Sequence, residues 1–182
     1  MGTDLEEYIE MLELIAFFAG FPLVYLLVHA FADQPKKPAV FFKKLAYLLP
    51  FSYALVGTLY FLFLIKNLYE EYSLRNNLHA FANPWLIIWA LSSLLMWSAL
   101  FRRKAYFSFL HSLVIFFLLL RDVFLYATDN LGKPMLVNDM KLYSGSLILN
   151  SGCLLLTYIL YLIIKHYPKY FGVKQSQRAD EL

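Results

Sequence analysis

The chain has 182 residues, of which 60% are hydrophobic, 19% aromatic and only 16% charged. A soluble domain of this length carries roughly a quarter charged residues, and a mean hydropathy of +0.56 is more apolar surface than so small a core can bury. The composition excludes an ordinary soluble domain and predicts an all-α, polytopic integral membrane protein. The net charge of +3 is interpreted as loop charge, so the lipid bilayer is an expected partner and nucleic acid is not.

Five apolar segments predict five transmembrane helices in one bundle. Residues 11–31 form the first span, in which Gly20 and Pro22 predict a bend. The second span contains Pro50, which predicts another bend. The later spans are expected at 45–65, 84–100, 105–127 and 142–164. Each is close to the roughly 20 residues that cross a bilayer as a helix. We therefore expect a single transmembrane domain over 1–182 that ends in a short basic cytoplasmic tail at 165–182.

The distribution of basic residues predicts the orientation of these spans. Eleven of the sixteen Lys and Arg residues lie in the 32–44 linker, the 101–104 turn and the segment after the fifth span. Basic loops stay on the cytoplasmic side, so the N-terminus is predicted outside and the C-terminus inside. The first residues are acidic and do not resemble an Arg-rich transit peptide. This pattern favours a multi-pass protein of the bacterial inner (plasma) membrane.

Two charged residues, Arg121 and Asp122, interrupt the fourth span. By helical rise they lie about 8–9 Å outward of the midplane, inside a hydrocarbon half-thickness of about 15 Å. Charges at this depth need partners. We expect Arg121 to pair with an acidic residue of the first span and Asp122 to pair with the basic residue that ends the second. The intramembrane polar cluster predicted from the sequence comprises Glu10, Glu13, Lys66, Arg121, Asp122 and Asn150.

Three interpretations of this cluster remain open. It is an ion-pair clamp that fixes the helices, a site for a ligand, ion or proton, or a set of interface residues on a span that ends early. Small residues surround Asn150 in the outer half of the fifth span, and small residues allow close helix contact in lipid. We expect that half to pack inward against the fourth span. The small residues are Ser144, Gly145, Ser146, Ser151, Gly152 and Cys153.

Histidines raise the possibility of a cofactor. His29 and His166 lie near cytoplasmic span ends, and His111 lies in the inner half of the fourth span. Two histidines from different helices at one depth can ligate a b-type haem, but these depths match poorly. We predict no cofactor and no metal, with haem b at His29, His111 or His166 as the alternative. Without haem, His111 is expected to hydrogen-bond Ser or Thr on a neighbouring helix.

The sequence contains no HExxH, GxSxG, P-loop or paired-cysteine motif, which favours a protein that is not an enzyme. Our first hypothesis is a non-catalytic membrane subunit or assembly factor of a larger complex, in contact with other membrane subunits or with copies of itself. The alternative is a small transporter, channel or ligand-sensing protein that uses the charged cluster. A third hypothesis is a haem-binding redox protein.

The predicted topology places Lys36 and Arg103 on the same, cytoplasmic side of the membrane. Single variants Lys36→Cys and Arg103→Cys, built on a Cys153→Ser background, are therefore expected to react with an impermeant thiol reagent only after the cytoplasmic face is opened. Labelling of intact cells and of inverted vesicles measures this. Reaction of the two positions from opposite sides would contradict the five-span topology.

Overall fold

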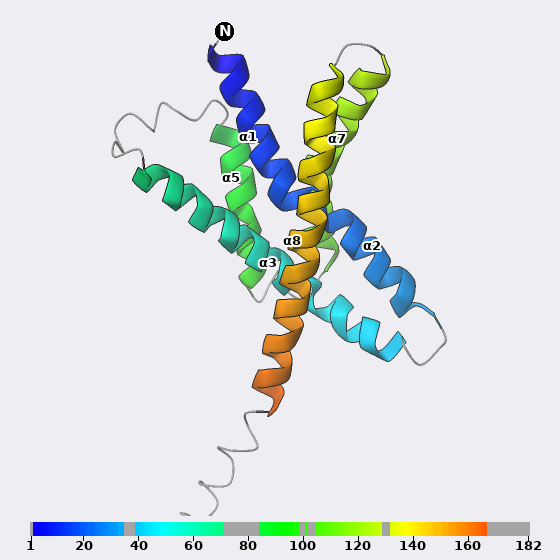
Figure 1. Cartoon of the computed structure of the whole chain (residues 1–182). Helices are drawn as coiled ribbons and strands as arrows, with labels where there is room; N and C mark the ends of the chain where they lie inside the picture. The colour runs from blue at the N-terminus through cyan, green and yellow to red at the C-terminus, as the bar shows by residue number, and fades with distance from the viewer. Residues whose placement is uncertain are drawn as a thin grey trace, which may run out of the picture.

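The computed structural model describes residues 2–34, 39–70, 84–98, 101, 105–128 and 132–166, and within these ranges the chain is helical and contains no strand. This confirms the all-α prediction. The predicted tail at 165–182 lies outside the described residues except for its first two, and His79 lies outside them as well. The elements in Figure 1 are α1 (Gly2–Phe18), α2 (Phe21–Ala32), α3 (Ala39–Glu70), α5 (Pro84–Ser92), the 3-10 helix η1 (Ser93–Trp97), α7 (Tyr106–Ala127) and α8 (Lys133–His166).

Four helical segments are long and apolar enough to cross a membrane, and a fifth apolar segment is shorter. The four are Tyr8–Ala32, Ala39–Asn67, Tyr106–Ala127 and Met135–His166. The successive segments alternate in direction (Figure 1), as consecutive membrane crossings require. The multi-pass helical architecture is therefore confirmed, and the second and fifth segments extend well beyond the predicted limits of 45–65 and 142–164.

The third segment differs from the full-length helix expected at 84–100. An α-helix runs from Pro84 to Ser92 and continues as a 3-10 helix to Trp97. Together the two helices are about 24 Å long, which is shorter than the roughly 30 Å thickness of the hydrocarbon core. The Ser92 hydroxyl donates a hydrogen bond to the Trp89 carbonyl at 2.6 Å. A serine that bonds a nearby carbonyl competes with the regular helix ladder, and this one lies at the point where the helix type changes.

The bend expected at Gly20 and Pro22 is confirmed as a break between two helices. Helix α1 ends at Phe18, and α2 begins at Phe21 with the proline in its first turn. Proline is tolerated there because the first amides of a helix have no intrahelical partner. Pro50, by contrast, lies inside α3, which continues as one helix on both sides of it.

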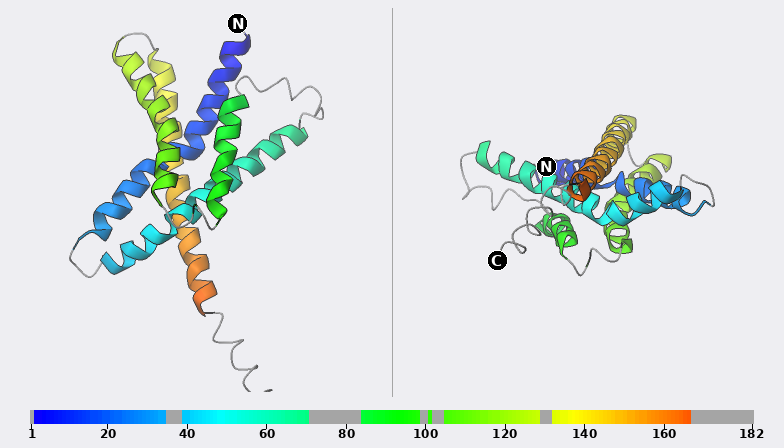
Figure 2. Two further views of the ribbon diagram at one scale, coloured as in Figure 1. Left: turned by 180° about the vertical axis from the view of Figure 1, so that it is seen from behind. Right: turned by 90° about the horizontal axis from the view of Figure 1, so that it is seen from below.

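The core lies where this break crosses α3. Phe18 and Phe21 flank the break, and both rings contact the fully buried Tyr53 of α3, with centroids 5.7 and 4.5 Å apart respectively. From this crossing the helices diverge, and α7 runs beside the N-terminal half of α8 in both Figure 1 and Figure 2. Only 17% of the most apolar stretch of α8 is buried, compared with 56% of the most apolar stretch of the segment Tyr8–Ala32.

Gly20 is the point of closest approach between the break and α8. A Cβ at this position would lie 2.6 Å from the backbone nitrogen of Leu147 and 2.6 Å from the backbone carbonyl carbon of Ser146. Backbone atoms cannot move aside as a flexible side chain can. The two segments therefore pack this closely only with glycine at position 20.

Replacing Gly20 by alanine is expected to destabilise the protein by about 1–3 kcal/mol, the usual cost of overpacking. The matched control is Gly152→Ala, because a Cβ there would meet nothing within 4 Å, and alanine is the better helix former. Thermal unfolding in detergent, followed by tryptophan fluorescence, measures both variants. Equal melting temperatures for Gly20→Ala and Gly152→Ala would contradict this account of the crossing.

Candidate functional site

The Arg121 guanidinium is paired with its own neighbour in the sequence. Arg121 Nε and Nη2 each donate to Asp122 Oδ1 at 3.1 Å, and Nη2 also lies 3.3 Å from Met11 Sδ of α1. The Arg121 side chain is 54% exposed and that of Asp122 only 4%. The ion pair seen here therefore differs from the one expected with Glu10 or Glu13, because the Arg121 guanidinium contacts the adjacent carboxylate of Asp122.

A second buried carboxyl group lies next to this pair. Asp139 of α8 is fully buried, and the Tyr8 hydroxyl of α1 donates to its Oδ1 at 3.3 Å. The carboxyl groups of Asp122 and Asp139 lie within electrostatic range of one another and of the Tyr8 hydroxyl. Asp139 precedes the predicted fifth span at 142–164, and neither it nor Tyr8 belongs to the cluster predicted from the sequence. We name Tyr8, Arg121, Asp122 and Asp139 the acidic cluster; it joins α1, α7 and α8.

The acidic cluster carries unpaired hydrogen-bonding capacity and a surplus of negative charge. Asp122 Oδ2 and Asp139 Oδ2 are both buried, and neither has a hydrogen-bond partner among the described residues. With both carboxyls ionised, the acidic cluster, as far as the chain is described, holds two negative charges and the one guanidinium of Arg121. Uncompensated charge is costly at membrane depth, so the cluster is chemically suited to take up one positive charge, either a proton or a monovalent cation.

The other acidic residues of the predicted cluster lie on a different face of α1. Helical spacing places Tyr8 and Met11 on one face and Glu10 and Glu13 on another. Glu13 is half-buried. The carboxyl groups of Glu10 and Glu13 lie within electrostatic range of each other and of the Tyr60 hydroxyl of α3. Lys66 is exposed near the end of α3. The structure thus divides the cluster predicted from the sequence into separate groups.

Asn150 belongs to the helix break rather than to the acidic cluster. Its Nδ2 donates to the Phe17 carbonyl at 2.8 Å, while the Gly20 amide donates to Ser146 Oγ at 2.9 Å. Both α8 side chains are fully buried. They satisfy backbone groups that the break removes from the helix ladder, which hydrocarbon cannot do. These two residues form a structural clamp between α8 and the break.

The clamp adds a second neighbour to the expected packing of the fifth span, in which Tyr143 of α8 contacts Phe116 of α7 with ring centroids 6.2 Å apart. Ser146 and Asn150 face the α1–α2 break rather than α7, which was the predicted neighbour. Gly145 and Gly152 point elsewhere, because a Cβ on either would meet nothing within 4 Å. The small residues of α8 therefore lie on two faces of the helix. One face packs against the break, and the other is open.

His111 forms a second polar node, between α3, α5 and α7. Its Nδ1 lies 2.6 Å from the Tyr53 hydroxyl, and its Nε2 lies 2.7 Å from Ser92 Oγ and 3.0 Å from the Trp89 carbonyl. The imidazole also stacks on the Trp89 ring, with centroids 3.9 Å apart. The expected hydrogen bond to a serine is confirmed. A haem iron at His111 would have to replace one of these ring-nitrogen contacts.

The other two histidines lie apart from this node. His29 of α2 packs against Tyr25, with ring centroids 4.4 Å apart and planes tilted by 39°, and His166 is exposed at the end of α8. Among the described residues, no group of three or more His, Cys, Asp or Glu side chains is arranged to hold a metal ion. Comparisons of the chain with family models, with curated proteins and with solved structures find no match.

Proposed function

We propose that the chain is a non-catalytic subunit or assembly factor that docks a transmembrane helix of a larger membrane complex. The observation that carries the proposal is the open face of α8. Gly145 and Gly152 are two helical turns apart, and an added Cβ at either would meet nothing. Ile148 and Leu155, which share this face by helical spacing, are 76% and 56% exposed. We name these four residues the docking face.

The physical reason is the way helices associate in lipid. Lipid tails are as apolar as leucine, so association depends on close packing and hydrogen bonds rather than on hydrophobic burial. Glycine allows a second backbone to approach closely, as Gly20 already does within this chain against Ser146 and Leu147. Gly145 and Gly152 offer the same kind of notch on the opposite face, and a helix from another subunit is the occupant that this surface favours.

We place this complex in the inner (plasma) membrane of a bacterium, with the N-terminus outside and the C-terminus in the cytoplasm. The basic residues near the starts of α3 and α7 and beyond α8 support that orientation. In it, the acidic cluster lies toward the outer face, since α7 ends and α8 begins there. The docking face then lies within the outer and central parts of the bilayer.

Purification in mild detergent with mass spectrometry tests the docking proposal. The wild-type chain is expected to carry a stoichiometric membrane protein, and the double variant Gly145→Leu/Gly152→Leu is expected to lose it because the leucines fill the notch. The control is Ala30→Leu, which makes a similar enlargement at an exposed position on α2. A wild-type chain that purifies alone would contradict the proposal, and so would a companion that survives both glycine substitutions.

The acidic cluster favours a second candidate function, a small transporter or ion-sensing protein. Its support is specific: two buried carboxyl groups, each with an oxygen that lacks a hydrogen-bond partner within the described part of the chain, and a surplus negative charge there when both are ionised. A monovalent cation or a proton bound there would restore neutrality. The partly exposed Arg121 at its edge gives the cluster a polar route toward the outer interface.

Cation-dependent unfolding tests this second candidate. Sodium or potassium ions are expected to raise the melting temperature of the wild-type protein above that in choline at equal ionic strength. Asp139→Asn should abolish the difference, because it removes the surplus charge while keeping the shape. Asp33→Asn, at the end of α2, is the matched control. If the wild-type protein melts at one temperature in all three salts at several pH values, the cluster binds no cation.

A further inference from the structure

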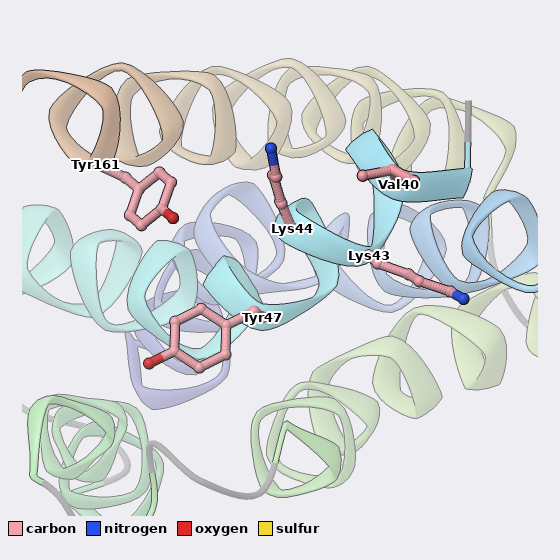
Figure 3. A pocket seen from close by; sticks show the side chains of 5 residues that line it. All are labelled: Val40, Lys43, Lys44, Tyr47 and Tyr161. Carbon is pink, nitrogen blue, oxygen red and sulfur yellow. The ribbon is translucent and has the colours of Figure 1, made fainter. Parts of the chain in front are cut away.

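A groove between α3 and α8 combines positive charge with an apolar wall. It is lined by Val40, Lys43, Lys44, Tyr47 and Tyr161 and has a volume of about 330 Å³. Figure 3 shows Lys44 reaching from α3 toward α8, the helix that carries Tyr161, while Lys43 extends in another direction. We name these five residues the basic groove. It lies apart from both the docking face and the acidic cluster.

The depth of the basic groove corresponds to the headgroup region. Lys43 and Lys44 lie in the second turn of α3, which begins at Ala39, and Tyr161 lies little more than one turn before the end of α8 at His166. Both helix ends belong to the side on which the basic residues of the chain concentrate. Tyrosine is also enriched at this level, where its ring meets lipid and its hydroxyl meets water.

The chemistry of the lining selects an anion that has an apolar part. The five lining residues include two ammonium groups and no carboxylate. Val40 and Tyr47 are 62% and 61% exposed, so the wall of the groove is open to the surrounding bilayer. A small soluble anion would use the lysines and leave this wall empty. A phospholipid would fill the wall with an acyl chain.

From these features we infer that the basic groove binds an anionic phospholipid, with its phosphate at the lysine end of the groove and an acyl chain along Val40 and Tyr47. Basic pockets between transmembrane helices on the cytoplasmic side bind anionic headgroups in this way. Tyr161 closes the groove from α8, so the lipid bridges two helices that are far apart in the sequence. This binding does not depend on the function proposed for the docking face.

Native mass spectrometry of the full chain, titrated with phosphatidylglycerol or phosphatidylcholine, tests the inference. The wild-type protein is expected to prefer phosphatidylglycerol. Lys43→Gln and Lys44→Gln should each weaken phosphatidylglycerol binding roughly fivefold, the usual effect of one basic residue near an anionic headgroup. The matched control, Lys141→Gln, removes an exposed lysine from the other end of α8 and should leave the preference intact.

Further measurements test whether the positive charge matters and which molecule occupies the groove. A Lys43→Arg/Lys44→Arg variant keeps both charges and should keep the preference, which separates the loss of charge from a folding defect. Equal binding of the two lipids by the wild-type chain would overturn the inference, as would an equal loss in Lys141→Gln. Inorganic phosphate that stabilises the lipid-free protein as well as phosphatidylglycerol does would assign the groove to a soluble anion and would also overturn it.

Discussion

The arrangement of the helices depends on two backbone groups in the middle of the first membrane segment. The break between α1 and α2 takes the Phe17 carbonyl and the Gly20 amide out of the helix ladder, and each would cost several kcal/mol if left unpaired in hydrocarbon. Ser146 and Asn150 of α8 bond both groups. The absence of a Cβ on Gly20 allows α8 to come close enough. The break therefore needs α8, and the crossing point of α8 is fixed by the break.

That one crossing determines what the rest of α8 can do. Because the clamp residues occupy the inward face, the glycines at 145 and 152 are left on the outward face. The helix continues past the crossing in both directions (Figure 1). Its first turns bring Asp139 to Tyr8 and near Asp122, and its last turns bring Tyr161 to the lysines of α3. The docking face, the acidic cluster and the basic groove are three consequences of one packing contact.

Much of the fold could be predicted because hydropathy and helix breakers act locally. Helix α7 matches the predicted 105–127 to within a residue, and the break follows from Gly20 and Pro22. The polar contacts could not be predicted in the same way. The predicted start of the fifth span at residue 142 left Asp139 outside it, although Asp139, Ser146 and Asn150, seven and four residues apart, share one helix face of α8. Arg121 pairs with Asp122 and also contacts Met11 of α1, a tertiary contact with no sequence signal.

The acidic cluster and the basic groove lie near opposite ends of α8 and differ in the sign of their charge. A lysine near an anionic leaflet contributes about 1 kcal/mol, so the proposed orientation, with Lys43 and Lys44 at the cytoplasmic leaflet, gains from both side chains. The carboxyl groups of Asp122 and Asp139 are then held toward the outer half. There Arg121, with more than half of its side chain exposed, can extend to the headgroups while Asp122 cannot. Any displacement of the guanidinium toward water leaves two carboxyl groups with less compensation. Under the proposed orientation and the proposed cation binding, the acidic cluster would attract a cation most strongly when Arg121 faces the outer solution.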